Sequence, residues 1–461
     1  MSNKFIIFAL SAIIFISGWL YRSSASSYFF QDDWFSLKIS DAKNLNDFLT
    51  FFIPRNDIIY YRPLGMQVPF FLLSKIFGIN HFPFWALTFI THIINIILVY
   101  VLSILLLKKR LLALLISFLY ATSAVHFLLF YWFAIYAFMA GPTAFFLSFI
   151  LFILFLNKKK KKYYLLSFLV FIIGLLTNEM IATLPAILFA YSLLLRKKII
   201  FKNLLPFFFL VIFLVLLRFI IFTPPVTGLY QLGLGRHIVS NFKTYFLWSF
   251  NWSEILTEQM VSIFVFNNKI TDQFSFYALL SIITFIVAVI LFYLLPLLFV
   301  FRQRVKISFS QIGFGMCWFI IGLSPVLLFS SHKFSYYLPI SLVGMLIFSV
   351  SLFYSLFRFI FSHNKSFSYF FVVTLIAAWL TISFATIDFN SRIHWAPRRA
   401  KLAKALVDVA KIQMASYGNL ADEIYIPLSS ENRLALNNQD GLKVIFKRES
   451  IVTAYSPELA K

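Results

Sequence analysis

The sequence predicts an all-α polytopic membrane protein with about eleven transmembrane helices, interfacial helices in its first external loop, and a small α/β extramembrane domain at the C-terminal end. Hydrophobic residues make up 61% of the 461 residues, and charged residues only 12%. Apolar runs of about 20 residues, the length that a helix needs to cross a bilayer, recur along the chain. Short clusters of Lys and Arg separate these runs, as in the loops of membrane proteins.

Hydropathy places eleven spans within residues 1–387, which we expect to form the transmembrane domain. They lie near residues 4–21, 83–107, 111–129, 139–156, 163–177, 180–195, 203–222, 275–301, 309–329, 336–358 and 367–387. The first span has a basic start and is followed by SSASS, as in a signal peptide, but its length favours a retained anchor.

The charges of the loops predict the orientation of the chain. Loops on one side of the expected membrane carry 18 basic residues and no acidic residue, whereas those on the other side carry 10 basic and 9 acidic residues. The positive-inside rule therefore predicts a multi-pass protein of the plasma (inner) membrane with a cytoplasmic N-terminus and an external C-terminal domain. The net charge of +23 is thus a topology signal that attracts membrane lipids, and it does not indicate a nucleic-acid partner.

The first external loop contains two segments that suit the membrane surface. Leu45, Phe48, Leu49 and Phe52 recur at helical spacing and predict a short amphipathic helix in the interface plane. Residues 63–78 are apolar but too short for a span and contain a proline, which favours an interfacial or re-entrant segment.

A second external loop covers about residues 223–274. Trp248 and Trp252 stand there among mixed polar residues, a composition that is typical of a segment lying at the membrane surface.

The C-terminal residues 388–461 differ in composition from the expected transmembrane domain, because they contain 11 basic and 8 acidic residues. The stretch PRRAKLAKALVDVAKIQ predicts a helix, with its proline near the start. We expect EIYIPL (423–428) and KVIF (443–446) to form short strands. The apolar face of the helix is predicted to comprise Leu402, Leu406, Val409 and Ala410.

The informative polar residues gather on the predicted outer face. Asp32 and Asp33 follow the first span, in the stretch YFFQDDWF. Acidic residues are costly inside a membrane, and Glu179 is the only one between residues 83 and 250. Two further stretches on this face are YYRPL, with Tyr60, Tyr61 and Arg62, and SHKFSYYLP, with His332, Lys333 and Tyr336.

Adjacent aspartates cannot act on the same atom. On a helix their side chains diverge by about 100°, and on a strand they point to opposite faces. One carboxylate can therefore serve as a general base for an acceptor hydroxyl or amide, while its neighbour orients or caps. A phosphate leaving group needs cationic donors, for which Arg62, Lys333 and His332 are candidates, with Arg62 the better bidentate clamp.

Together these stretches resemble the GT-C superfamily of membrane glycosyltransferases, and most closely its branch of protein O-mannosyltransferases and family-39-like bacterial enzymes. The resemblance consists of an external DD pair after the first span, a YRPL-like sequence in the same loop, an acid with a following proline in NEMIATLP, and a late YYLP. It extends over about residues 1–360. Two features depart from the pattern, because Asn178 stands where a basic residue often precedes the acid, and HKFSYYLP has no Arg.

The resemblance implies a bundle of transmembrane helices with an active site at the outer face and a polyprenyl-phosphate-linked sugar as donor substrate. Asp32, Asp33, Arg62 and Glu179 match motif positions, and Asp32 is the preferred catalytic carboxylate. Asp33 is the second catalytic candidate. The donor phosphate is expected to contact Arg62, Lys333, His332 and Tyr61, with Glu179, Tyr60 and Tyr336 in support.

The expected activity is the transfer of this sugar to a protein, lipid or glycan acceptor, with inversion at the anomeric carbon. A transporter or a flippase for lipid-linked glycans is an alternative, but such proteins place ionisable residues near the membrane midplane, often in repeats. An O-antigen ligase or polymerase is another alternative. It would explain residues 223–274, but not the DD pair or YYRPL.

The sequence predicts no certain cofactor and leaves a divalent metal open. His81, His92 and His126 share no spacing that suggests a metal site.

Overall fold

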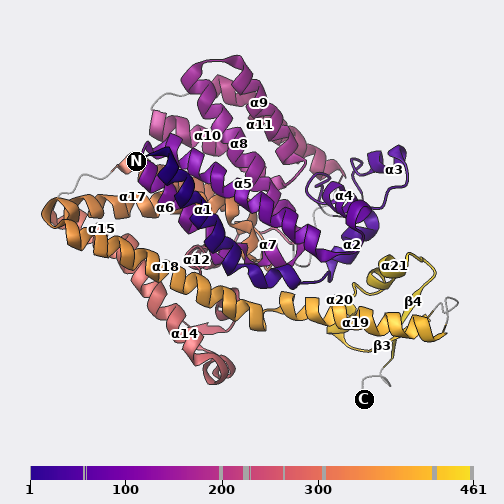
Figure 1. Ribbon diagram of the computed structural model, residues 1–461. Coiled ribbons are helices and arrows are strands. Elements are labelled where there is room, and N and C mark those ends of the chain that lie inside the picture. The colour runs from indigo at the N-terminus through magenta and orange to yellow at the C-terminus, as the bar shows by residue number, and fades with distance from the viewer. Residues whose placement is uncertain are drawn as a thin grey trace.

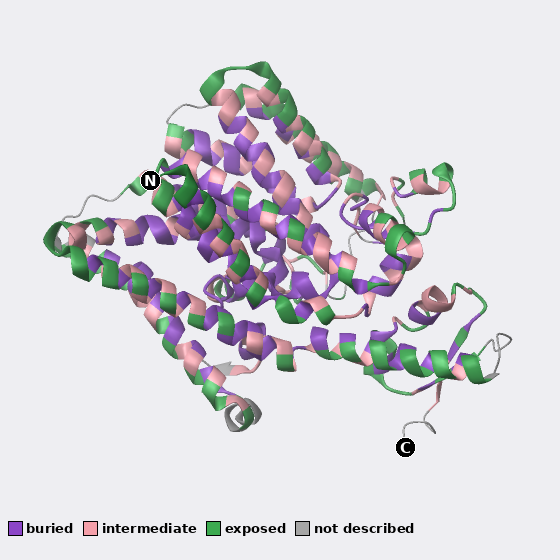
Figure 2. Cartoon of the chain, viewed as in Figure 1, coloured by how far each residue is buried: buried purple, intermediate pink, exposed green. Residues whose placement is uncertain are grey.

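The computed structural model describes residues 2–55, 58, 60–196, 201–221, 228, 230–262, 265–303, 308–417 and 423–456. Within them, the chain forms a bundle of long helices, from which one helical arm leads to a small C-terminal unit (Figure 1). Buried residues concentrate inside the bundle, and exposed residues lie toward its periphery (Figure 2). The outer faces nevertheless carry large apolar side chains, such as Phe8 and Phe209, which are 71% and 72% exposed.

Nine helical segments of the described chain are long and apolar enough to cross a membrane, or ten if the bent pair α6 and α7 forms one span. These are the features of an integral, multi-pass membrane protein, as predicted. The segments are built from α1 (Asn3–Leu20), α5 (His81–Leu107), α6 (Arg110–Ala121), α7 (Phe127–Tyr131), α8 (Ala137–Lys158), α10 (Leu184–Tyr191), α11 (Phe201–Ile221), α14 (Asn268–Val289), α15 (Leu295–Gln303), α16 (Phe309–Leu327), α17 (Pro339–His363) and α18 (Lys365–Ile393).

Two of the eleven expected spans differ from the prediction. The segment expected at 163–177 forms α9 (Lys161–Leu175), whose 15 residues are fewer than the roughly 20 that a perpendicular span needs. The segment expected at 111–129 is bent by 40° between α6 and α7. At this bend the Thr122 hydroxyl donates to the Phe118 carbonyl at 2.8 Å, a local bond that competes with the helical ladder.

Small residues allow α16 and α17 to pack closely. A Cβ atom on Gly315 would lie 2.6 Å from the backbone nitrogen of Phe348, and one on Gly344 would lie 2.7 Å from that of Phe319. Small residues at such crossings let helix backbones approach, which is a common packing mode in membrane proteins. The contact fixes α17 and thereby the residues that precede it.

The segment between the first two spans forms short helices, as predicted. They are η1 (Arg22–Ser26), α2 (Asp32–Ile39), α3 (Leu45–Thr50) and α4 (Gln67–Phe77). In α3, Leu45 and Leu49 are 71% and 52% exposed, so part of the expected apolar stripe faces away from the protein. With 11 residues, α4 is shorter than a span. Figure 1 shows α2, α3 and α4 at the right, on the side of the C-terminal unit, and the N-terminus at the left.

The C-terminal unit begins inside a continuous helical arm. α18 runs past residue 387 to Ile393, and α19 (Trp395–Tyr417) follows after the single residue His394. Of its expected apolar face, Leu406 and Ala410 are buried, whereas Val409 is 44% exposed.

The prediction of one of the two strands in this unit is wrong. EIYIPL forms β3 (Glu423–Pro427) as predicted, but KVIF lies at the end of α21 (Asp440–Phe446). A run of four apolar residues does not distinguish a strand from a helix, and an acidic residue in the first turn favours the helix. The partner of β3 is instead β4 (Val452–Ser456), in parallel register, and α20 (Ser430–Ala435) lies between them in the chain.

The second external loop also differs from the prediction. Trp248 and Trp252 are only 4% and 2% exposed, so they pack inside the protein instead of lying at a membrane surface. The indole of Trp248 donates to the Thr257 hydroxyl at 3.0 Å, which satisfies its polar atom. Their surroundings are α12 (His237–Trp248), α13 (Glu254–Glu258) and the antiparallel pair β1 (Met260–Ser262) and β2 (Val265–Phe266). The remaining short elements are η2 (Ala124–His126), η3 (Phe133–Ile135), η4 (Glu179–Thr183), η5 (Ser192–Arg196), η6 (Ile290–Leu294) and η7 (Ser335–Tyr337).

Candidate active site

The two adjacent aspartates at the start of α2 have different surroundings. Asp33 is fully buried, and its carboxylate accepts the backbone N–H of Phe30 at 3.2 Å and that of Ala134 at 2.6 Å. The first bond satisfies the N–H of Phe30 just before α2, and the second ties α2 to η3. Asp32 instead lines a cavity of about 450 Å³, which we call the Asp32 cavity.

Burial changes the acidity of both carboxyl groups. It raises the pKa of Asp32 to about 6, and the guanidinium of Arg399 opposes this shift. Burial also raises the pKa of Asp33, while the backbone donors at Phe30 and Ala134 oppose it. A carboxylate that titrates near neutral pH and faces a cavity can take up and release a proton during a reaction. Asp32 meets both conditions.

Arg62 is paired with Glu179 at the wall of the same cavity. Its Nε donates to Oε2 of Glu179 at 2.6 Å, and its Nη2 donates to Oε1, so the pair is bidentate. The guanidinium also lies over the rings of Tyr60 and Phe138, at 4.7 and 4.5 Å from their centroids. These contacts compensate the burial of a side chain that is only 10% exposed.

A close backbone contact brings Arg62 and Glu179 together. The Leu64 N–H donates to the Leu176 carbonyl at 3.1 Å, so the loop after Arg62 runs along the end of α9. A Cβ atom on Gly65 would lie 2.2 Å from the carbonyl oxygen of Thr177, which a larger residue could not tolerate. The glycine after YYRPL therefore permits the approach of Arg62 to Glu179.

Residues 332–337, the late motif of the sequence, contribute unequally. His332 lines the Asp32 cavity, contacts the Tyr337 hydroxyl through Nδ1 at 2.9 Å, and stacks on Tyr230 at 4.3 Å between ring centroids. Burial lowers the pKa of His332 to about 4, and Arg62 adds to this effect, so the imidazole is neutral at pH 7. A neutral imidazole offers a phosphate a hydrogen bond without the positive charge that the sequence analysis expected. Tyr336 also lines the cavity.

Two expected phosphate ligands lie elsewhere. Lys333 is not among the residues that line the Asp32 cavity in the described chain. Burial raises the pKa of Glu258, and the charge of Lys333 opposes this shift, which places Lys333 near Glu258. Tyr61 also lies outside the lining, and its hydroxyl donates to the Phe52 carbonyl at 2.8 Å. Tyr60, by contrast, lines the cavity.

The C-terminal unit supplies a wall of the cavity that the sequence did not reveal. Trp395 and Arg399 of α19 both line it. Arg399 donates to Gln31, the residue before Asp32, and to both oxygens of Glu431 at 3.1 and 3.2 Å. Nothing in the sequence around Arg399 distinguishes it from the other basic residues of the C-terminal unit, so only the folded chain identifies it.

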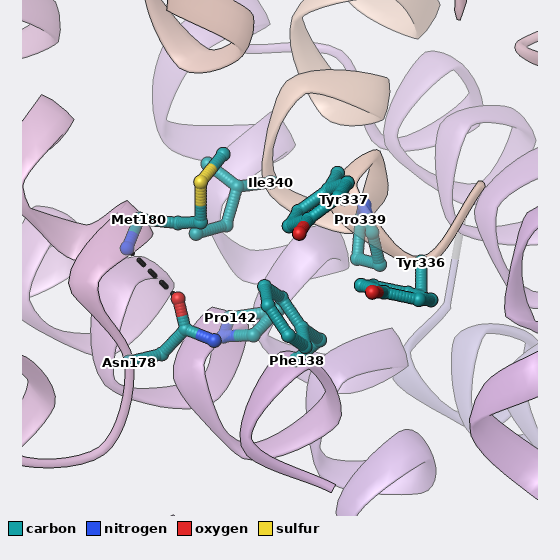
Figure 3. A pocket seen from close by; sticks show the side chains of 8 residues that line it. All are labelled: Phe138, Pro142, Asn178, Met180, Tyr336, Tyr337, Pro339 and Ile340. Atoms are coloured by element: carbon teal, nitrogen blue, oxygen red, sulfur yellow. Dashed lines mark hydrogen bonds between the residues drawn. The ribbon is translucent and has the colours of Figure 1, made fainter. Parts of the chain in front are cut away.

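Most of the cavity wall is aromatic. Phe138 and Tyr336 face each other with 4.8 Å between ring centroids, and both also line a small adjoining pocket, where the Asn178 side chain accepts the N–H of Met180 at 2.8 Å (Figure 3). The charged groups that the described residues contribute are one carboxylate and two guanidiniums. The lining of the Asp32 cavity comprises Gln31, Asp32, Tyr60, Arg62, Trp132, Ala134, Ile135, Phe138, Tyr230, His332, Phe334, Tyr336, Tyr337, Trp395 and Arg399.

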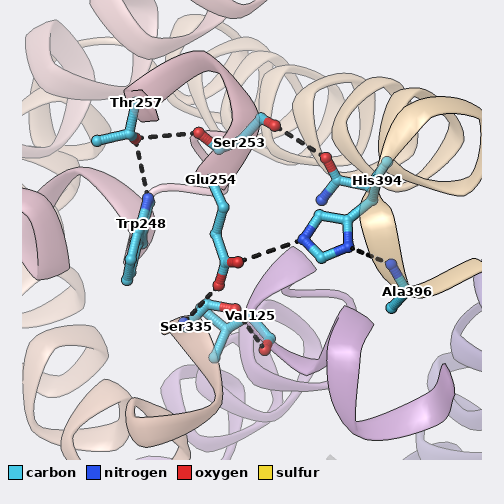
Figure 4. Close-up of polar contacts among 9 residues, drawn as sticks. Val125, Trp248, Ser253, Glu254, Thr257, Ser335, His394 and Ala396 are labelled. Carbon is cyan, nitrogen blue, oxygen red and sulfur yellow. Dashed lines mark hydrogen bonds and ion pairs between the residues drawn. The ribbon is translucent and has the colours of Figure 1, made fainter. Parts of the chain in front are cut away.

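A buried carboxylate links the joint between α18 and α19 to this wall (Figure 4). Glu254 accepts the backbone N–H of Ser335 at one oxygen and the Nε2–H of His394 at the other, 3.4 Å away. The N–H of Ala396 donates to Nδ1 of His394 at 3.2 Å, so the imidazole proton lies on Nε2. Because His394 adjoins Trp395 and Ser335 lies between Phe334 and Tyr336, the pair holds two parts of the cavity wall together.

Among the described residues, the lining offers a divalent metal little support. Asp32 is the one carboxylate that these residues contribute to it, and two guanidiniums accompany it. In the described residues, no group of three or more His, Cys, Asp or Glu side chains could hold a metal ion.

Comparisons with known proteins give a limited result. No protein-family model matches the chain, and no curated protein matches it. Among solved structures, the chain is similar to the Archaeoglobus fulgidus oligosaccharyltransferase in complex with Zn and sulfate, with 12% identity and a TM-score of 0.46. The match covers 98% of this chain and 62% of that one, so the chain spans less than two thirds of the archaeal enzyme. A likeness of this degree assigns neither activity nor substrate.

Proposed function

We propose that the protein is a GT-C-type membrane glycosyltransferase that moves a sugar from a polyprenyl-phosphate-linked donor to an acceptor at the outer face of the membrane. The observation that carries the proposal is the meeting, in one aromatic cavity, of Asp32 and the Glu179-bound Arg62. The two residues come from the DD pair and the YYRPL stretch, and Glu179 from NEMIATLP, which are three of the four stretches where the sequence resembles that superfamily.

The proposed reaction is a single displacement at the anomeric carbon. Asp32 accepts the proton of the acceptor as its oxygen or nitrogen forms the bond to that carbon. The bond from the carbon to the phosphate oxygen breaks, and its electron pair leaves with the polyprenyl phosphate. Arg62 stabilises the negative charge that grows on the leaving phosphate, and Glu179 fixes the orientation of the guanidinium. The sugar inverts because the acceptor attacks from the face opposite the phosphate.

The position of the charged groups supports an enzyme over a transporter. Asp32 begins the short helix α2 and Arg62 lies in the loop before α4, so neither residue stands within a helix of span length. Transporters of known design place such groups near the membrane midplane, at breaks within helices. The aromatic wall also suits a sugar, whose C–H faces pack on aromatic rings.

Replacement of Asp32 by Asn tests the proposal. Membranes that contain the D32N variant should transfer sugar from a panel of radiolabelled polyprenyl-phosphate sugars about 10²–10⁴ times more slowly than wild type, because the general base is lost. The matched control is D41N, which removes an exposed carboxylate of the same loop outside the cavity and should leave transfer unchanged. Full activity of folded D32N would refute the role of Asp32, and no transfer by wild type from any polyprenyl-phosphate sugar would refute the function.

A further inference from the structure

A second cavity, of about 380 Å³, lies where η1 meets the joint of α18 and α19. We call it the Lys401 cavity. It shares no lining residue with the Asp32 cavity. Its charged lining residues are Lys401 and Lys404 of α19 and Arg392 and Asp388 of α18. Hydroxyl groups, among them those of Ser23, Tyr28 and Tyr131, also line it.

The Lys401 cavity has an excess of positive charge. Arg392 is paired with Asp388, one turn earlier in α18, through contacts of 3.0 and 3.1 Å. Lys401 and Lys404 are exposed and have no ion pair with any residue that the structure describes. Two ammonium groups thus remain to attract an anion.

Hydroxyl donors accompany these charges. Burial raises the pKa of Tyr28 to about 12, so its phenol stays protonated and can donate a hydrogen bond. The hydroxyls of Ser23 and Tyr131 share one hydrogen bond of 2.9 Å, which uses one of their two protons and leaves the other to donate. A phosphate, with several acceptor oxygens, suits this mixture of ammonium and hydroxyl donors.

An exposed aromatic pair lies on the helices that lead from this cavity into the helical bundle. Trp19, four residues before Ser23, stacks on Phe384, four residues before Asp388, with 5.4 Å between ring centroids. Both rings are nearly half exposed, at 46% and 43%. They stand on α1 and α18, helices of span length, near the ends that lead to the cavity. Aromatic side chains at such positions lie at the boundary between lipid chains and head groups.

We propose that the Lys401 cavity binds the phosphate of an anionic lipid, whose hydrocarbon chain lies against Trp19 and Phe384. The cationic cavity lies about one helical turn along the chain from the aromatic pair, whose Trp19 ring is also covered by the Arg22 guanidinium at 4.4 Å. This arrangement matches an anionic lipid, whereas a soluble anion would make no use of the aromatic pair. The lipid is either an anionic phospholipid or a polyprenyl phosphate, which share a phosphate ester on a long chain. The proposal does not rest on the glycosyltransferase function.

Native mass spectrometry of the full chain in a neutral detergent tests this site, with phosphatidylglycerol as the probe and phosphatidylcholine as the zwitterionic comparison. We expect the double variant K401Q/K404Q to bind phosphatidylglycerol at least about tenfold more weakly than wild type, and wild type to prefer it over phosphatidylcholine. K411Q, an exposed lysine of α19 outside the cavity, is the matched control and should bind as wild type. Equal affinity of the double variant and wild type, or no preference between the two lipids, would overturn the proposal.

Competition identifies the source of the phosphate. Displacement of phosphatidylglycerol by an equimolar polyprenyl phosphate would assign the site to the isoprenoid lipid, and its retention would assign it to phospholipid. Either result agrees with the proposal. Displacement by inorganic phosphate or glucuronate at similar concentrations would instead show a site for soluble anions and overturn it. Trp19→Ala should weaken lipid binding several-fold. Unchanged binding by this variant would contradict the proposal that the hydrocarbon chain of the lipid lies against Trp19.

Discussion

The Asp32 cavity has two walls of different origin. On the inner wall, Arg62 of the loop before α4 is fixed by Glu179, the first residue of η4. On the outer wall, Arg399 is fixed by Gln31 and by Glu431 of the C-terminal unit. Both guanidinium side chains are 10% exposed. The same chemical group thus serves the cavity twice, once from the loop before α4 and once from the C-terminal unit.

The position of Asp32 therefore depends on both parts of the chain. α2 is tied to η3 of the bundle by Asp33, whose carboxylate accepts the Ala134 N–H. It is tied to the C-terminal unit by Trp34, whose indole donates to the Ala435 carbonyl at 2.9 Å, and by the Lys38 to Asp440 ion pair at 2.8 Å. The C-terminal unit is therefore part of the candidate site, and variants of the two walls can be compared directly.

After the loss of transfer expected for D32N, the largest effect should follow from breaking the inner wall. Arg62→Ala removes the proposed phosphate donor, so the KM for the polyprenyl-phosphate sugar should rise about 10–100-fold, the value of a charge-assisted hydrogen bond. R62K should recover only part of this loss, because an ammonium cannot replace the bidentate fork. Steady-state kinetics at varied donor concentration measure the donor KM of both variants. An unchanged donor KM in folded R62A would contradict the role of the inner wall.

A smaller, pH-dependent effect should follow from breaking the outer wall. The guanidinium of Arg399 holds the pKa of Asp32 below the value that burial alone would give, so R399Q should raise this pKa above about 6. Because a general base must be ionised, the acidic limb of the kcat/KM profile should move to higher pH. Transfer should fall several-fold at pH 6 and change little at pH 8. In the part of the chain that the structure describes, the other charged or titratable groups around Asp32 are Asp33, Tyr60, Arg62, Tyr230, His332, Tyr336 and Tyr337.

Arg398 provides the matched control for that experiment. It is exposed, adjacent in α19 and outside the cavity lining, so R398Q should keep the wild-type pH profile. A wild-type profile in R399Q, or the same shift in both variants, would show that the outer wall does not tune Asp32.

The smallest effect on transfer should come from the link between the walls. In the variant Glu254→Gln, one of the two carboxylate oxygens becomes an NH₂ group, which cannot accept a hydrogen bond. Either the Ser335 N–H or the His394 Nε2–H then remains buried without an acceptor. Such a loss costs about 1–3 kcal/mol, which should appear as a lower unfolding temperature in detergent. Transfer at 25 °C should fall only a few-fold through kcat. A stability equal to that of wild type would show that Glu254 does not hold this joint.

The sequence predicted much of the inner wall. Hydropathy located a helix or helix pair at every expected span, because about 20 apolar residues suffice to identify a crossing. The short motifs selected Asp32, Arg62, Glu179, His332 and Tyr336, and the folded chain brings the first two and the last two into one lining. The ion pair between Glu179 and Arg62 was not predicted from the sequence. It depends on the close contact at Gly65, which involves residues far apart in the chain.

The sequence by itself determined the membrane class, the order of the helices and the scarce acidic residues worth attention, because hydropathy and charge are properties of short segments. Tertiary structure alone decided that Asp33 is occupied by backbone donors while Asp32 faces a cavity. It also decided that KVIF is helical, that Trp248 and Trp252 are buried, and that Arg399 completes the outer wall. Burial, pairing and the resulting pKa values depend on neighbours that are hundreds of residues away, and no local pattern specifies them.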